Sequence, residues 1–303
     1  MTTVRALINE ATAQLHEAGC VSPQTDAELL LAHVLRVERS DLINFENIAD
    51  SQSAQFQKLV TSRANRIPLQ HLTGVAYFRY LTLQVGQGVF MPRPETELLV
   101  QSGLDELAQL DGPKLVVDLC SGSGAIALSL ALESADTTVH AVELSNDAFD
   151  WLEKNVAAYT DQLSRMNSTI ITYNDDATSR NLLAKLKGTV DVVLSNPPYI
   201  PDEMIPREPE VREYDPVLAL FGGADGLQVA RKVALVASDL LRPSGFFAFE
   251  HADVQKESSV ALLTEMQNNG QPLWTDVVDH DDYNELPRYV TAKRTSFSSV
   301  GAQ

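Results

Sequence analysis

The segment Asn196-Pro197-Pro198-Tyr199 contains the residue types that would hold a planar amino group. Its two prolines fix the backbone and lack N–H donors, so carbonyl oxygens remain as the free polar groups. The Asn196 side chain adds another acceptor oxygen, and Tyr199 adds a flat aromatic face. Two acceptors for two N–H hydrogens would orient an –NH₂ group that stacks on this face. A rigid exit from a strand with an Asn-capped turn is the alternative interpretation.

A second candidate site is the small-residue loop Asp118-Leu119-Cys120-Ser121-Gly122-Ser123-Gly124. Small residues let the backbone turn tightly and approach a ligand closely. Glu143 follows 25 residues after Asp118, and a carboxylate can accept hydrogen bonds from both hydroxyls of a ribose. The loop is not a full GxGxxG pattern, which favours a nucleoside over a dinucleotide. A glycine-lined turn beside a solvent-exposed glutamate would explain these residues without a ligand.

Two further groups of polar residues could do chemistry. Glu250 and His251 are neighbours that could form an acid–base pair, although we expect His251 to belong to the wall of a substrate site. The acidic residues between positions 279 and 285 lack the glycine and the spacing of an EF-hand loop, which favours a solvated turn. The two cysteines form no CxxC pair, and the six histidines show no ligand spacing. We therefore expect no metal site.

Alternating strands and helices should position these motifs. Strands are predicted at Lys114–Leu119, Thr138–Val142, Ser168–Tyr173, Val190–Leu194 and Gly245–Phe249, with helices at Ala125–Leu132, Asp147–Tyr159 and Val229–Leu241. Two later segments, Trp274–Val278 and Arg288–Ala292, would add an antiparallel edge pair. This order predicts an α/β fold with a doubly wound, mostly parallel, seven-stranded Rossmann-like sheet. The motifs then follow strands at the carboxyl edge, where such folds bind ligands.

The N-terminal part of the chain is predicted to be separate and helical. Apolar residues at helical spacing, such as Leu7, Ala11 and Leu15, predict three short helices in a domain covering residues 1–74. Aromatic and β-branched residues around Gly86 and Gly88 predict a β-hairpin linker over residues 75–91. The sheet domain would cover residues 92–296, and the Ser-rich end, residues 297–303, should fray.

Composition excludes several classes of protein. The 303 residues are 44% hydrophobic, which excludes a largely disordered chain. A balance of 23 Lys+Arg against 41 Asp+Glu gives a net charge of −18, with no basic run, which disfavours sequence-independent nucleic-acid binding. The N-terminus is no signal peptide, and no apolar run approaches the roughly 18 residues of a membrane span. We expect a soluble, reduced, cytoplasmic protein.

Longer segments carry a family resemblance. Gly88–Glu97 ends in Pro-Arg-Pro-Glu-Thr-Glu, and residues 68–74, 195–200, 211–216 and 219–227 add matching stretches. With these segments the chain resembles the peptide-chain-release-factor glutamine methyltransferases (the HemK/PrmC family) from about residue 65 to about residue 294. These are class I S-adenosylmethionine-dependent methyltransferases. Cys120 stands where a glycine is common, Glu143 replaces a commoner Asp, and Asp215 replaces the usual Glu.

The resemblance implies a reaction. Methyl transfer from S-adenosylmethionine would reach the glutamine amide of the Gly-Gly-Gln motif in class I release factors, tuning translation termination. Partners would be these release factors, with no direct nucleic acid and no membrane, and the enzyme would be a monomer whose helical domain recognises the substrate. The implied catalytic residues are Asn196, Pro197 and Tyr199. The implied cofactor residues are Asp118, Cys120, Ser121, Gly122, Ser123, Gly124, Glu143, Asp176, Ala177 and Asn196. The implied substrate residues are Asn196, Pro197, Pro198, Tyr199, Arg93 and Glu95.

Two other functions use the same residues. A nucleobase methyltransferase acting on exocyclic amines of DNA or RNA could use the Asn-Pro-Pro-Tyr segment, but the net charge of −18 argues against it. A non-catalytic nucleoside-binding protein could retain the fold, but the intact Asn196–Tyr199 segment argues against that.

Overall fold

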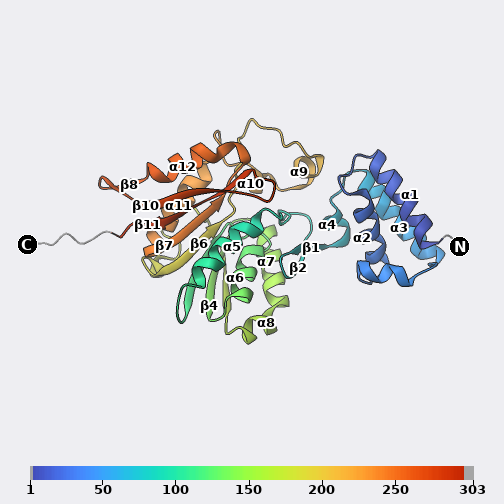
Figure 1. Ribbon diagram of the computed structural model, residues 1–303, viewed down its shortest axis with the longest axis horizontal. Helices are drawn as coiled ribbons and strands as arrows, with labels where there is room; N and C mark the ends of the chain where they lie inside the picture. Colours follow the sequence, from blue (N-terminus) through green and yellow to red (C-terminus); the bar gives the residue numbers. More distant parts are fainter. Residues whose placement is uncertain (1–2, 297–303) are drawn as a thin grey trace, which may run out of the picture. The chain divides into compact units, whose positions relative to one another are not determined.

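The computed structural model describes residues 3–296 and falls into two compact units (Figure 1). The first, here called the helical unit, contains the chain up to Val75 with the segments Val85–Gln87 and Pro206–Tyr214. The second, called the sheet unit, contains Ala76–Gln84, Gly88–Ile205 and the chain from Asp215 onward. The predicted frayed segment, 297–303, lies outside the described residues.

The helical unit is built around three helices that share one apolar core. Its elements are α1 (Val4–Glu17), α2 (Pro23–Leu35), a 3₁₀ turn η1 (Arg39–Asn44), α3 (Asp50–Ala64), α4 (Leu69–Thr73) and α9 (Pro209–Tyr214). Helix α2 begins with Ser22 at the N-cap and Pro23 at its first position, where the fixed φ of proline suits a helix start. Leu15, Leu30 and Phe56, one from each long helix, are fully buried, so the helical periodicity forms this core.

An ion-pair network ties the distant segment 206–214 into the helical unit. Arg63, only 8% exposed at its side chain, contacts Asp26 and Glu210 at 2.8 Å each. Arg66 contacts the other oxygen of Glu210 at 2.5 Å. The predicted domain bounds assign residues 206–214 to the sheet domain, whereas in the structure this segment packs in the helical unit. A buried arginine needs such partners, because an unpaired buried charge is costly.

Glu210→Gln is expected to lower the free energy of unfolding by about 1–2 kcal/mol at neutral pH, because an amide accepts weaker hydrogen bonds than a carboxylate. Burial alone would raise the pKa of Glu210, but hydrogen bonds from Arg66 and Arg63 outweigh it and lower the pKa from 4.5 to about 2. Since the folded-state pKa lies below the unfolded value, Glu210 stabilises the fold above pH 4.5 and loses that contribution as the pH falls towards 2. Urea unfolding measures this for the native protein and for Glu210→Gln as the pH is lowered from neutral towards 2. The difference between their free energies of unfolding should become smaller as the pH falls. A constant difference would contradict the ion-pair role.

The sheet unit contains the predicted seven-stranded sheet. Its strands are β3 (Lys114–Leu119), β4 (Thr137–Glu143), β5 (Thr169–Asn174), β6 (Val190–Ser195), β7 (Leu241–Glu250), β10 (Trp274–Asp281) and β11 (Pro287–Arg294). Their order is β10-β11-β7-β6-β3-β4-β5. The strands from β7 to β5 pair in parallel, whereas β11 pairs antiparallel with both β7 and β10. The doubly wound, mostly parallel sheet with an antiparallel edge pair is confirmed.

Helices cover both faces of this sheet (Figure 1). The helices of the sheet unit are α5 (Thr96–Leu107), α6 (Ala125–Glu133), α7 (Asn146–Ala158), α8 (Thr160–Arg165), α10 (Val217–Leu220), α11 (Gln228–Leu240) and α12 (Lys256–Thr264), with 3₁₀ turns η2 (Ala184–Leu186) and η3 (Asp253–Gln255). Alternate residues of β3, such as Val117 and Leu119, join the core under α11 and α12. On the opposite face α5 lies so close to β6 that a Cβ added at Gly103 would come within 2.8 Å of the Leu194 side chain.

Two small antiparallel ribbons complete the fold. One is β8 (Gln267–Asn268) with β9 (Gln271–Pro272), and the other is the hairpin β1 (Val75–Phe78) with β2 (Leu81–Gln84). The hairpin turns at Arg79 and Tyr80, inside the predicted linker 75–91 but ahead of Gly86 and Gly88. Arg79 adopts a left-handed φ of +50°, a conformation that glycine adopts more readily. No helix among the described residues is long and apolar enough to cross a membrane.

Candidate functional site

The small-residue loop turns sharply at the carboxyl end of β3. Cys120, Gly122 and Gly124 have φ values of +66°, +54° and +85°. Glycine adopts such angles readily, but at Cys120 the side chain makes the conformation cost about 1–2 kcal/mol. The Ser121 amide donates to the Val142 carbonyl at 3.0 Å and its hydroxyl donates to the Asp118 carbonyl at 3.0 Å, which holds the turn. Cys120 therefore tolerates a positive φ at a position where a glycine is common in the family that the sequence resembles.

Glu143 ends β4 and is fixed beside the loop by both of its carboxylate oxygens. Oε2 accepts from the Gly122 amide and Oε1 from the Ser145 amide, each at 2.8 Å. Burial raises the pKa of Glu143, whereas these amide bonds act in the opposite direction. The residue is 8% exposed, so the alternative of a solvent-exposed glutamate is wrong. Each oxygen keeps a second lone pair, which leaves Glu143 able to accept from hydroxyl groups.

The loop and its surroundings fit a nucleoside ligand that carries an ammonium group. The Oδ1 atom of Asp118 is buried without a hydrogen-bond partner among the described residues, although Oδ2 accepts from the Ala127 amide at 3.1 Å. Burial raises the pKa of Asp118 to about 7, and a nearby cation would favour its charged form. A Cβ added at Gly122 would meet no atom within 4 Å, so space is open beside the loop.

Asp176 and Ala177, two of the implied cofactor residues, follow β5 at the same edge of the sheet. Asp176 Oδ1 accepts from the amide and the hydroxyl of Thr178 at 2.8 and 2.7 Å. Ala177 is 4% exposed and packs in the same core cluster as Val142. Their contact with the cofactor stays a prediction.

Close backbone packing holds the Asn196–Tyr199 loop in place after β6. A Cβ at Gly222 would lie 2.4 Å from the Pro198 carbonyl oxygen, and one at Gly226 would lie 2.2 Å from the Tyr199 carbonyl oxygen. The Gln255 side chain donates to the Tyr199 carbonyl at 2.9 Å. The loop therefore has little freedom to move without disturbing three other segments.

Two acceptors of this loop remain free for a ligand. Within residues 3–296 no hydrogen bond is made to the Pro197 carbonyl or to Asn196 Oδ1. The Asn196 amide nitrogen instead donates to the hydroxyl of Thr96 at 3.1 Å. This arrangement is the one that the planar-amine interpretation requires, with two acceptors and an aromatic residue at the end of a parallel strand. Thr96, at the start of α5, was not among the predicted site residues.

Arg93 and Glu95, the predicted substrate residues ahead of α5, differ in their surroundings. Arg93 donates to Asp215 at 2.7 Å and lies 5.0 Å from the centre of the Phe90 ring. Asp215 is 7% exposed, so the aspartate at this position is already paired within the protein. Glu95 is the N-cap residue of α5 and makes no side-chain capping bond. Their contact with a substrate stays a prediction.

His251, expected to belong to the wall of a substrate site, lies in the protein interior directly after β7, and that assignment stays a prediction. It is fully buried, and its ring nitrogens lie 2.9 Å from the Ala252 carbonyl and 2.8 Å from Asp279. The prediction of a solvated turn at 279–285 is wrong for Asp279 and Asp282, because Asp279 pairs with His251 and Asp282 pairs with Arg288 at 3.0 Å. No group of three or more potential metal ligands occurs in the described part of the chain.

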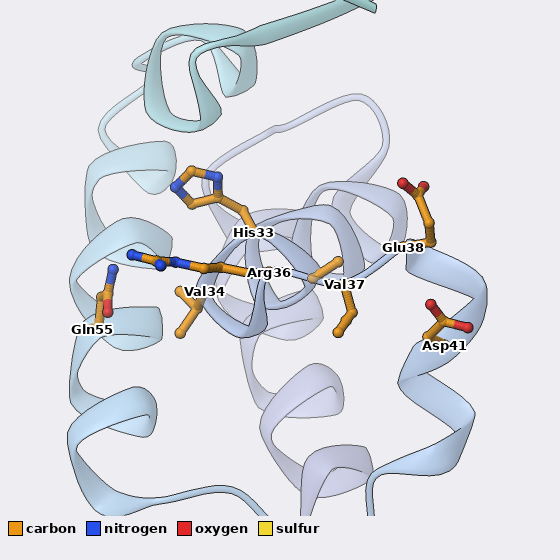
Figure 2. A pocket seen from close by; sticks show the side chains of 8 residues that line it. His33, Val34, Arg36, Val37, Glu38, Asp41 and Gln55 are labelled. Carbon is orange, nitrogen blue, oxygen red and sulfur yellow. The ribbon is translucent and has the colours of Figure 1, made fainter.

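The helical unit has a groove of its own at the end of α2 (Figure 2). Figure 2 shows Arg36 extending towards Gln55 of α3, whereas Glu38 and Asp41 lie on the other side, around η1. The groove contains none of the residues predicted for the cofactor or the glutamine. Its open, mixed-charge lining gives no indication of chemistry.

Comparisons with known proteins match two stretches of the chain. The family described as PrmC N-terminal domain matches residues 6–74, and the family described as Conserved hypothetical protein 95 matches residues 73–214. The release factor glutamine methyltransferase of Streptomyces coelicolor is 43% identical, over 97% of this chain and 99% of that protein. The enzyme of the same name from Mycobacterium tuberculosis H37Rv is 40% identical, over 96% and 92%.

Solved structures show the same fold at lower identity. The hMettl16 catalytic domain, solved in complex with MAT2A 3'UTR hairpin 6, is 15% identical and matches with a TM-score of 0.52. The match covers 85% of this chain and 86% of that one. At this identity the likeness concerns the fold alone.

Proposed function

This chain belongs to the release factor glutamine methyltransferase family, and from that premise we propose the reaction it catalyses. A methyl group passes from S-adenosylmethionine to the side-chain amide nitrogen of the glutamine in the Gly-Gly-Gln motif of class I release factors. The observation that carries this proposal is the pair of free acceptors, Asn196 Oδ1 and the Pro197 carbonyl, on a rigid loop at the carboxyl end of β6. They match the two hydrogens of a primary amide.

The protein contributes mainly by positioning. An amide nitrogen is a weak nucleophile because its lone pair is delocalised, whereas the methyl sulfonium of S-adenosylmethionine is an activated electrophile. Asn196 and the Pro197 carbonyl hold the glutamine amide in one orientation and stabilise the positive charge that develops on its nitrogen. Tyr199 supplies the flat face against the amide. The proton can leave after transfer, so no strong base is required.

The loop after β3 and the residues beside it would hold the cofactor. Glu143 accepts from the ribose hydroxyls, and Asp118 has an unpaired oxygen for the methionine ammonium. Ser121 and Gly122 shape the open turn between them, and Asp176 follows β5 at the same edge.

Glu143→Ala is expected to weaken cofactor binding by about 1.5–3 kcal/mol, the worth of hydrogen bonds to a charged group. That is about 10- to 150-fold in the dissociation constant measured by calorimetry. Glu257→Ala, which removes an exposed glutamate from α12, is the matched control and should leave affinity unchanged. Equal affinity in Glu143→Ala and the native protein would show that the ribose contact lies elsewhere.

Labelled S-adenosylmethionine tests the choice of substrate. The protein is incubated with purified release factor, with tRNA and rRNA, or with DNA, and label in each is counted. Label should enter the release factor and be lost when its Gly-Gly-Gln glutamine is replaced by alanine. Label in nucleic acid would favour the exocyclic-amine alternative, which the net charge of −18 disfavours. The proposal places the reaction in the cytoplasm, with a monomeric enzyme acting on translation termination.

A further inference from the structure

A chain of hydrogen bonds runs from the glutamine-binding loop into the core of the sheet unit. Asn196 Nδ2 donates to the Thr96 hydroxyl at 3.1 Å, and that hydroxyl donates to Glu250 Oε2 at 2.6 Å. The Tyr199 hydroxyl donates to Glu250 Oε1 at 3.3 Å. Glu250 is 1% exposed and Thr96 is 4% exposed, so water does not replace these contacts. One buried carboxylate thus connects two residues of the Asn196–Tyr199 loop.

The chemistry of these groups fixes the direction of each bond. A threonine hydroxyl has a single proton, and an ionised carboxylate can only accept. Thr96 therefore gives its proton to Glu250 and uses a lone pair to accept from Asn196. This in turn requires the nitrogen end of the Asn196 amide to face Thr96, so that its oxygen end is turned away and free.

We propose that Thr96 and Glu250 are positioning residues that set which end of the Asn196 amide faces the substrate. Neither has to touch the substrate. Their role rests on the proposed function, because a glutamine –NH₂ can donate only to the oxygen end of Asn196. With the amide reversed, two N–H groups would face each other and the acceptor would be lost.

The charge of Glu250 decides whether this direction holds. A protonated Glu250 can itself donate to Thr96, which frees the Thr96 proton for Asn196 Oδ1 and favours the reversed amide. Burial raises the pKa of Glu250 to about 7, and Glu95 acts in the same direction, whereas Thr96, Tyr199 and the Arg288 guanidinium lower it. Arg288 is itself paired with Asp282, which holds its guanidinium group in place. We therefore expect Asn196 Oδ1 to face the substrate above neutral pH and to turn away from it as the pH falls below neutral.

Substitution of Thr96 tests the hydrogen-bond direction. Thr96→Val keeps the shape and removes the hydroxyl, and it should lower kcat on release factor by about 10- to 100-fold, the usual effect of a lost positioning contact. The KM for release factor and the cofactor dissociation constant should change by less than about threefold. Thr96→Ser keeps the hydroxyl and is the matched control, so its kcat should remain near that of the native enzyme. If Thr96 were needed for folding alone, Thr96→Val would not lower kcat while the KM and the cofactor dissociation constant stay unchanged.

Substitution of Glu250 tests the charge dependence. Single-turnover transfer by the native enzyme should decline below about pH 7 as Glu250 takes up a proton. In Glu250→Gln the side chain is neutral at every pH in this range, and its amide, like the protonated acid, can donate to Thr96. Transfer by this variant should therefore stay near the low-pH rate of the native enzyme and show no acid decline. Thermal melting and cofactor titration of each variant show whether the fold is intact.

The outcomes separate this inference from the proposed function. If the native enzyme labels release factor and Thr96→Val does so at the same rate, the positioning role is overturned and the function stands. An acid decline that persists unchanged in Glu250→Gln also overturns it. If the native enzyme puts no label into release factor, the proposed function fails, and this inference fails with it.

Discussion

Asn196→Ala is expected to lower kcat for methyl transfer to release factor by about 10²–10³, the usual effect of losing one preorganised polar contact. The substitution removes the Oδ1 acceptor and leaves the Pro197 carbonyl, so the glutamine amide can rotate and its nitrogen loses alignment. The Thr96 hydroxyl also loses its donor, but this hydroxyl still donates to Glu250. The rest of the loop should stay in place, because Gly222, Gly226 and Gln255 hold it through backbone contacts.

Cofactor affinity of the same variant should change by less than about tenfold, or 1.4 kcal/mol, because most predicted cofactor contacts lie on the loops after β3 and β4. Single-turnover methyl transfer and cofactor titration measure the two effects separately. Turnover close to that of the native enzyme would refute the role of Asn196 in holding the amide. Loss of cofactor binding instead would mean that Asn196 serves the cofactor.

The sheet could be predicted from the sequence because its signal is local. The run Lys114–Leu119 contains apolar and β-branched residues and is bounded by turn residues, and β3 has these bounds. The strand β7 begins at Leu241, four residues before the predicted start at Gly245, because Pro243 in the sequence indicates a break in a strand. In the structure Pro243 lies where the pairing of β7 with β6 is irregular, so the strand continues through it. The short helices α9 and α10 were not predicted, since six and four residues are too few to show a helical period.

The site could be predicted only where the chain itself brings residues together. The motif Asn196–Tyr199 is continuous, so its chemistry can be read directly. Thr96 lies 100 residues from Asn196 and 154 from Glu250, and no spacing along the chain reveals their contact. In the same way, the acidic residue Asp279 looks solvated until the fold places it against His251. Tertiary partners, not residue type, decide whether such polar groups are exposed or buried.

Removal of residues 1–72 should reduce kcat/KM on intact release factor by at least about 10³, or 4 kcal/mol, if the helical unit provides the binding energy for the protein substrate. The helical unit has its own apolar core and contains none of the predicted cofactor or glutamine-binding residues. Because the deletion removes Arg63 and Arg66, the partners of Glu210, it is best combined with Glu210→Gln. Calorimetry should give a cofactor affinity within about threefold of the full chain.

A short peptide containing Gly-Gly-Gln is the matched substrate for this deletion. Such a peptide offers the reacting glutamine but little surface for recognition, so the full chain should methylate it slowly. If the helical unit acts through recognition alone, the full and shortened chains should methylate the peptide at equal rates and differ only on the intact release factor. Full-rate methylation of intact release factor by the shortened chain would show that recognition resides in the sheet unit. Equal losses on both substrates would mean that the helical unit supports the catalytic fold itself, because a recognition defect cannot slow transfer to a peptide that the unit does not bind.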